Sequence, residues 1–176
     1  LDVSDIHEKF IGDEWFGGYS FSPNGKYFVY VAVPKKEKIT SFFDNDVSEE
    51  STFIPNRYNY DEDWGEKYEG VSRLGLFVLD IENKITKEIS GINLNDTVGQ
   101  PTFTPCSQGV VYTAWLGSYR KLGMIYCYQR PCEIRLTHFI ENIFESTNQN
   151  PIQHFTISTQ FSLARSPRFN YSTDNT

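Results

Sequence analysis

The chain has 176 residues, enough for one domain with a sizeable hydrophobic core. Its formal net charge of −7 argues against nucleic acid as a partner, and no cluster of Lys and Arg with interleaved aromatic residues offsets that charge. No apolar run approaches the roughly 20 residues that are needed to span a bilayer, so we expect no membrane partner.

The sequence begins at Leu1 and contains a single methionine, Met124. Because there is no initiator methionine, we expect residues 1–176 to be a fragment of a longer protein. A secretory signal peptide is also absent from this stretch.

The first predicted strand lies within residues 5–14, before a Trp-Phe-Gly-Gly sequence whose paired glycines permit a sharp bend. Residues 27–32, YFVYVA, form the next predicted strand. It shows no polar alternation, which indicates that both of its faces are covered. Residues 34–60 are rich in Lys, Ser, Asp, Glu and Asn with little periodicity, so we interpret them as an insertion outside the core.

A β-hairpin is predicted after the insertion. Residues 74–81, LGLFVLDI, form a strong strand, and the alternating residues 85–89 form its partner after a short polar turn. Residues 110–115, VVYTAW, then repeat the buried-strand pattern.

Three more strand segments are expected in the C-terminal half. Tyr126-Cys127-Tyr128 ends one strand, residues 133–139 form another, and residues 155–161 supply an outer strand. One segment is ambiguous, because five apolar residues have the spacing of an amphipathic helix face: Leu136, Phe139, Ile140, Ile143 and Phe144. A hairpin that turns at Glu141-Asn142 competes with this helix over residues 136–144, and we favour the hairpin.

The chain contains an internal repeat. Five residue pairs share one offset of 82 positions: Phe21 with Phe103, Pro23 with Pro105, Val29 with Val111, Tyr30 with Tyr112, and Ala32 with Ala114. Each copy joins an aromatic-x-Pro turn to a short apolar strand, as repeat architectures do. A degraded third copy begins at Ser166, with Pro167 and Phe169 in the expected places.

These patterns predict an all-β fold made of antiparallel four-stranded blades, an incomplete β-propeller with about two blades and the start of a third. The first blade covers about residues 5–98 with the insertion at 34–60, the second about 99–165, and the third starts at 166–176. A two-sheet sandwich with buried central strands is the alternative.

The sequence supports no catalytic, cofactor-binding or metal-binding residue. A Ser-His-Asp arrangement is arithmetically possible with His7, His138 and His154, but the Gly-x-Ser-x-Gly elbow that such a nucleophile needs is missing. We therefore interpret the histidines as structural or surface residues. The acidic run at 61–66 lacks the ligand pattern of a calcium loop, so we interpret it as a solvated or hydrogen-bonding loop in which Trp64 packs.

The chain has three cysteines, Cys106, Cys127 and Cys132, which cannot all pair within it. Their spacing matches no zinc pattern, and the odd count fits a reducing compartment better than a disulfide scaffold. We expect all three to be buried, inert thiols.

The sequence Glu62-Asp63-Trp64-Gly65-Glu66, followed by a strand ending in Val78-Leu79-Asp80, resembles the N-terminal propeller of the acylaminoacyl peptidases, members of the prolyl oligopeptidase family of serine peptidases. The resemblance runs in order from about His7 to Arg168. It departs from the family at Asn170-Tyr171, where a Ser-Pro turn is expected. The resemblance also implies a strand followed by a turn at 133–139.

This resemblance implies a function for the parent protein. Such enzymes release N-acylated amino acids from blocked peptides, using a catalytic serine, aspartate and histidine in a C-terminal α/β-hydrolase domain. That domain is absent here, so the chain would be the non-catalytic propeller that gates access to it. The resemblance further implies a cytoplasmic homo-oligomer.

A propeller that acts only as a protein-interaction scaffold is the alternative function. Scaffold propellers of the WD type carry Gly-His and Trp-Asp signatures, whereas this chain has only Asp63-Trp64 in the reverse order. A Gly-x-Ser-x-Gly elbow in a longer product of the same transcript would favour the peptidase.

Overall fold

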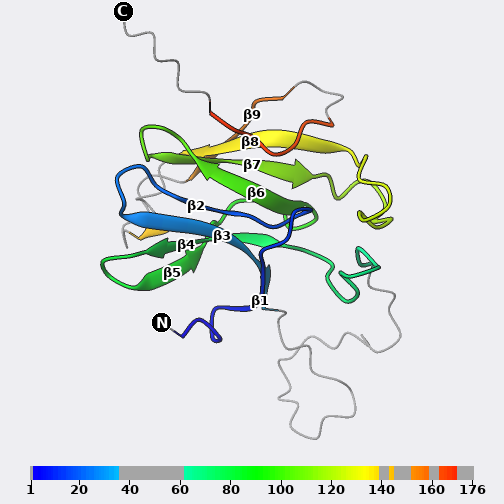
Figure 1. Cartoon of the computed structure of the whole chain (residues 1–176), viewed down its shortest axis with the longest axis horizontal. Coiled ribbons are helices and arrows are strands. Elements are labelled where there is room, and N and C mark those ends of the chain that lie inside the picture. Colours follow the sequence, from blue (N-terminus) through cyan, green and yellow to red (C-terminus); the bar gives the residue numbers. More distant parts are fainter. Residues whose placement is uncertain (1, 36–61, 139–142, 145–151, 159–162, 170–176) are drawn as a thin grey trace, which may run out of the picture.

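A computed structural model describes residues 2–35, 62–138, 143–144, 152–158 and 163–169. These residues form nine β-strands in two antiparallel sheets, and the second sheet lies over the first (Figure 1). The part of the chain that is described contains no α-helix, and so none that could cross a bilayer. The all-β prediction is confirmed, and the arrangement is consistent with an incomplete propeller.

The first sheet has β3 and β4 at its centre. β4 pairs with β5 on one side, and β1 and β2 share the opposite edge of β3, one after the other. Its strands are β1 (His7–Ile11), β2 (Tyr19–Phe21), β3 (Tyr27–Pro34), β4 (Gly75–Asp80) and β5 (Ile85–Glu88). The predicted hairpin at 74–89 is therefore confirmed as β4 and β5.

The second sheet has four strands in chain order, each antiparallel to the next. They are β6 (Thr97–Phe103), β7 (Gly109–Trp115), β8 (Cys132–His138) and β9 (Gln153–Thr156). The expectation that two strands are covered on both faces is confirmed, because all of β7 and six of the eight residues of β3 are buried. The division of the chain into blades at about residue 98 stays a prediction.

The two repeat copies form the same local structure. In the β2–β3 turn the N–H of Ser22 donates to Tyr27 O, and in the β6–β7 turn the N–H of Thr104 donates to Gly109 O, both at 2.9 Å. The left-handed position of each turn holds Gly25, with φ of 73°, and Ser107, with φ of 63°. The turns also touch, since the N–H of Asn24 donates to the Ser107 hydroxyl at 3.0 Å.

The main core lies between the sheets. Val29, Val31 and Val78 of the first sheet share one buried cluster with Val110 and Tyr112 of the second. Successive residues of a strand point to opposite faces, so Tyr30 and Phe77 form a separate, smaller cluster on the other face of the first sheet.

Two strand predictions need correction. β7 ends at Trp115 and no strand contains residues 126–128; the whole stretch from 116 to 131 is irregular. The outer strand, β9, covers Gln153–Thr156, and Ile157 and Ser158 follow it without strand structure. The rest of the predicted strand to residue 161 includes positions outside the described residues.

The strand predicted at 133–139 is confirmed as β8, which ends at His138. Leu136 is therefore extended and is not part of a helix. The alternative hairpin turn at Glu141-Asn142 lies outside the described residues. Phe144, just beyond, stacks on Tyr27 of the first sheet with ring centroids 5.7 Å apart.

Candidate functional site

A cleft of about 380 Å³ opens where the edge strands β2 and β6 lie side by side. Three segments form its walls: the loop between β1 and β2, the bulged part of β6, and the stretch that follows Leu163. The residues that line it are Asp13, Glu14, Gly17, Gly18, Tyr19, Ser20, Gln100, Pro101, Thr102, Ser166, Pro167 and Arg168.

The loop wall is built around Asp13. Its Oδ1 accepts the N–H groups of Trp15 and Phe16 at 2.9 and 3.1 Å, and that of Gly17 at 3.4 Å. Burial alone would raise the pKa of the Asp13 carboxyl, but the nearby Tyr68 hydroxyl and these N–H groups outweigh burial and lower it. The carboxylate therefore stays charged and holds the loop in one shape.

Gln100 joins the three walls. It occupies the bulge in β6 with φ of 52°. Its Nε2 donates to Trp15 O at 2.8 Å, while its Oε1 accepts the Thr113 hydroxyl at 2.9 Å and the N–H of Ser166 at 2.8 Å. These three hydrogen bonds have normal lengths. Through them one side-chain amide links the loop before β2, the second sheet and the segment after Leu163.

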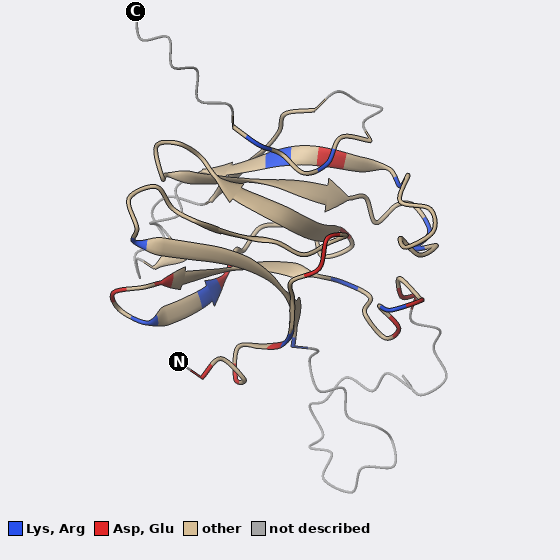
Figure 2. Ribbon diagram, viewed as in Figure 1, with Lys and Arg blue, Asp and Glu red and all other residues tan. Residues whose placement is uncertain are grey.

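The acidic motif at 62–66 lies across the junction of the two sheets. Asp63 closes its own turn, since its two carboxylate oxygens accept the N–H groups of Gly65 and Gly70 at 2.9 and 2.6 Å. Glu62 accepts the N–H of Lys121 at 3.1 Å. Figure 2 shows this acidic loop beside the basic loop of residues 117–131. The hydrogen-bonding interpretation of the motif is confirmed.

Glu66 holds the backbone just before the segment 126–128, where a strand was predicted. Its Oε2 accepts the N–H groups of Met124 and Ile125 at 3.3 and 2.9 Å. These two N–H groups, in a stretch without strand partners, are therefore satisfied by a carboxylate. Among the described residues no group of three or more His, Cys, Asp and Glu could hold a metal ion.

The three histidines lie apart from the cleft. His7 Nε2 lies 2.8 Å from the Tyr30 hydroxyl, and the His138 ring packs edge-on against Phe155. His154 Nδ1 lies 2.9 Å from the Thr137 hydroxyl and 3.3 Å from that of Tyr112. Neither His7 nor His154 hydrogen-bonds a serine hydroxyl in the described part of the chain.

The cysteine prediction is partly wrong. Cys132 is buried, and burial raises the pKa of its thiol to about 11. Cys106 and Cys127 are exposed instead. Cys106 lies in the β6–β7 turn, where hydrogen bonds from Thr104 and from the Gln108 backbone lower the pKa of its thiol. All three thiols are free.

His154 provides a pH-dependent contact between the sheets. Its Nε2 lies 2.9 Å from Ser90 O, and because that N–H must donate to the carbonyl, Nδ1 accepts from the hydroxyls. Burial, and then the positive charge of Arg135, lower the pKa of His154, although the bond to Ser90 opposes them. The folded protein therefore favours the neutral ring.

We expect the free energy of unfolding to fall as the pH drops below about 6.5, the ordinary histidine value. Below that pH the unfolded chain takes up a proton, while His154 in the folded chain does not until the pH reaches its lower folded pKa. Urea unfolding of wild type and His154→Gln across this window measures the effect. The two proteins should differ by a constant above pH 7.5 and converge as the pH falls. A pH-independent difference would contradict this role of His154.

The cleft, the acidic motif and the His154 contacts are all held by hydrogen bonds between segments that are far apart in the sequence. A family model described as the N-terminal domain of acylamino-acid-releasing enzyme matches residues 3–174. The chain belongs to this family.

Relatives from plants and animals support the assignment. The acylamino-acid-releasing enzyme of Arabidopsis thaliana is 32% identical over 179 residues, which cover 93% of this chain and 23% of the relative. Those of Mus musculus and Homo sapiens are 31% and 30% identical, and each match covers 74% of this chain and 20% of the relative. The chain thus spans about a fifth of the length of these acylamino-acid-releasing enzymes.

Within the family, sequence reasoning found the motif at 62–66 but missed the cleft. Tyr19, Gln100 and Arg168 belong to no shared pattern, and they come together only because β2 and β6 are neighbours. The proline and glycine residues beside them, Gly18 and Pro101, were the signal that could have pointed to the bulge.

Proposed function

We propose that this chain is the non-catalytic propeller part of a serine peptidase that releases N-acylated amino acids from blocked peptides. The match of residues 3–174 to the N-terminal domain of acylamino-acid-releasing enzyme carries the proposal. In this role the chain gates substrate access to an α/β-hydrolase domain outside residues 1–176. The protein works in the cytoplasm, and its partners are that domain, N-acylated peptides and further copies of itself.

The cleft supports a gating role. It lies at the edge strands of both sheets and its walls are held by hydrogen bonds of Asp13 and Gln100, so its shape is fixed before a peptide arrives. Glu14, Tyr19 and Arg168 remain exposed on its walls. Such a polar opening can contact an extended peptide without performing chemistry on it.

Hydrolysis of an acetyl-alanyl chromogenic amide tests the proposal, together with labelling by a serine-reactive fluorophosphonate. Both are run on residues 1–176 and on the longest product of the transcript. We expect turnover and labelling only in the long product. Inactivity of both proteins would favour the interaction scaffold, and labelling of residues 1–176 would show that the chain contains a nucleophile of its own.

A further inference from the structure

A hydroxyl residue stands directly before a proline at three places in the sequence: Ser22-Pro23, Thr104-Pro105 and Ser166-Pro167. Proline-directed protein kinases phosphorylate a hydroxyl in this position, because proline has no N–H that the kinase would leave unpaired. The dipeptides are equivalent in sequence, so only the surroundings of each hydroxyl in the fold can distinguish them.

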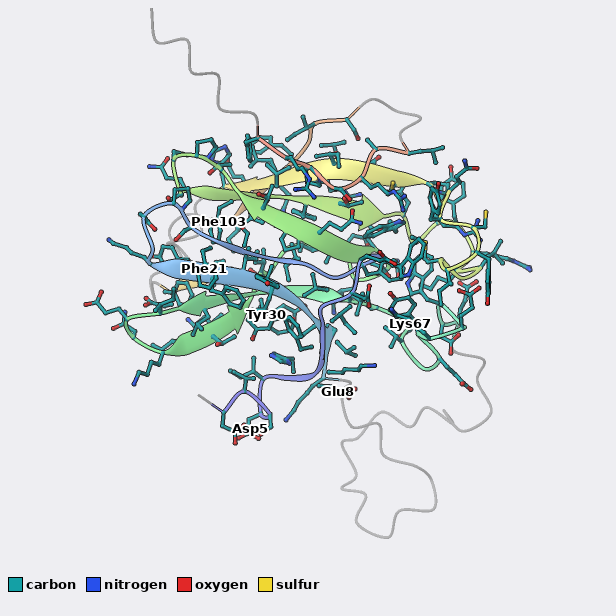
Figure 3. All side chains as sticks on the ribbon, in the orientation of Figure 1. Asp5, Glu8, Phe21, Tyr30, Lys67 and Phe103 are labelled. Atoms are coloured by element: carbon teal, nitrogen blue, oxygen red, sulfur yellow. The ribbon has the colours of Figure 1, made fainter. Side chains whose placement is uncertain are left out.

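The hydroxyls of Ser22 and Thr104 are committed to the turns that these residues begin. Ser22 Oγ accepts the N–H of Tyr27 at 2.8 Å. Thr104 directly follows Phe103, which Figure 3 labels on β6, and its hydroxyl oxygen accepts the N–H of Gly109 at 3.0 Å. Ser22 and Thr104 are only 3% and 7% exposed. Neither hydroxyl can therefore enter another protein's active site unless its turn opens.

Ser166 is exposed, and no hydrogen bond involves its hydroxyl within the described part of the chain. Its backbone N–H makes the contact that holds it, donating to Gln100 Oε1 at 2.8 Å. Residues 164–169 are irregular and run over the second sheet, coloured orange to red in Figure 1. Because Ser166 also lines the cleft, a group attached to its hydroxyl has open space beside it.

The backbone of Ser166 also favours its capture by a kinase. Its φ is 54°, in the left-handed region that serine seldom adopts. A kinase binds its substrate as an extended segment, so capture relieves this conformation and gives up the N–H contact with Gln100. No strand ladder has to open, since residues 164–169 belong to none of the strands in the described ranges.

Two arginines near Ser166 suit a phosphate. Arg165 lies over the ring of Tyr128, 4.1 Å from its centroid, and Arg168 lines the same cleft as Ser166. Neither arginine pairs with a carboxylate among the residues whose positions are described. A phosphoserine carries about −1.5 to −2 charges at neutral pH and forms strong hydrogen bonds with guanidinium groups. The surroundings of Ser166 therefore suit the modified side chain as well as the free hydroxyl.

We propose that Ser166 is a phosphorylation site for a proline-directed serine/threonine kinase, and that its phosphate then lies in the cleft beside Arg168. Ser166 Oγ forms a bond to the γ-phosphorus of ATP while the bond between that phosphorus and the bridging oxygen breaks, and ADP leaves with the bridging oxygen. The hydroxyl proton passes to the catalytic base of the kinase.

Phosphorylation changes the charge of the cleft. Asp13 and Glu14 lie on the loop wall, and Arg168 is the only cation among the lining residues. A phosphate adds about −1.5 to −2 charges to this already acidic lining. The consequence rests on the proposed function: if blocked peptides pass through the cleft, the phosphorylated protein disfavours acidic ones.

Incubation of the long product with ATP and a recombinant proline-directed kinase tests the site, with peptide mass spectrometry as the readout. The matched controls are synthetic peptides of residues 17–28, 99–110 and 161–172, in which all three hydroxyls are accessible. We expect the kinase to modify all three peptides, but in the folded protein to modify Ser166 many-fold faster than Ser22 or Thr104. An unmodified Ser166, or equal modification of the three residues, would overturn the proposal.

The KM for a pair of blocked peptides measures the effect on the cleft. We expect phosphorylation to raise the KM of acetyl-Ala-Glu several-fold and not that of acetyl-Ala-Lys, and kinase treatment of Ser166→Ala to change neither. Equal changes for the two peptides would overturn the effect of the phosphate on the cleft. The mass measurement needs no turnover, so failure of the phosphorylation site is distinguishable from failure of the proposed function.

Discussion

Replacing Gly99 with alanine is expected to lower the free energy of unfolding by about 3 kcal/mol, the upper range for forcing extra atoms into a packed core. A Cβ at this position would lie 2.1 Å from Phe16 O. That carbonyl is fixed, because it accepts the N–H of Gln100 at 3.1 Å and belongs to the loop that Asp13 holds. The strand β6 and the loop must therefore separate, which opens the contact between the sheets.

Urea unfolding followed by tryptophan fluorescence measures this loss. Gly12→Ala is the matched control, since its Cβ would meet only the ring of Phe10, which is exposed and able to move. We expect Gly12→Ala to stay within about 0.5 kcal/mol of wild type, as exposed substitutions do. An equal midpoint for Gly99→Ala and Gly12→Ala would show that the loop yields and that the close approach is unimportant.

Replacing Trp64 with alanine is expected to cost about 4 kcal/mol, the usual range for truncating a buried aromatic residue. Trp64 is only 4% exposed and its ring lies 4.9 Å from that of Phe16. Its Nε1–H also donates to the Thr97 hydroxyl at 2.9 Å. Truncation thus leaves a cavity between the motif at 62–66 and Thr97, the first residue of β6. It also removes a buried hydrogen bond.

Two further variants separate these effects. Trp64→Phe keeps most of the ring but removes the donor, so we expect a loss of about 1 kcal/mol from the hydrogen bond. Trp15→Ala is the control, because Trp15 is only partly buried and packs on Tyr128 at 6.0 Å. If Trp64→Ala and Trp15→Ala lower the thermal unfolding midpoint by the same amount, then Trp64 does not hold the sheets together.

These contacts show what each residue of the motif at 62–66 does in the fold. Asp63 shapes the turn, Trp64 fills the space between the sheets, and Glu62 and Glu66 hold the loop of residues 117–131. A match to this motif in a family member therefore reports on how two sheets are joined. It says nothing about bond cleavage.

The sequence alone determined the strongest strands, the repeat and the family. Residues 27–32, 74–81 and 110–115 are apolar runs flanked by turn residues, and such local patterns specify strands whatever surrounds them. The packing of Trp64 could also be predicted, because a large apolar ring in a polar loop is stabilised by burial against the core. These signals are local, so they can be read without knowing which segments meet.

Only the tertiary structure decided the rest. The sequence of residues 126–128 is typical of a strand, but the stretch is irregular, and Ile125 just before it donates its N–H to Glu66, 59 residues away. No local sequence pattern distinguishes Cys106 and Cys127 from Cys132. Of the three, the fold buries only Cys132. Phe21 and Phe103 occupy the same repeat position and differ in exposure, 61% against 3%. Phe103 belongs to the core between the two sheets, whereas Phe21 lies on the outer face of the first sheet. Contacts between distant segments, which no local pattern encodes, determine which residues are buried and where the cleft forms.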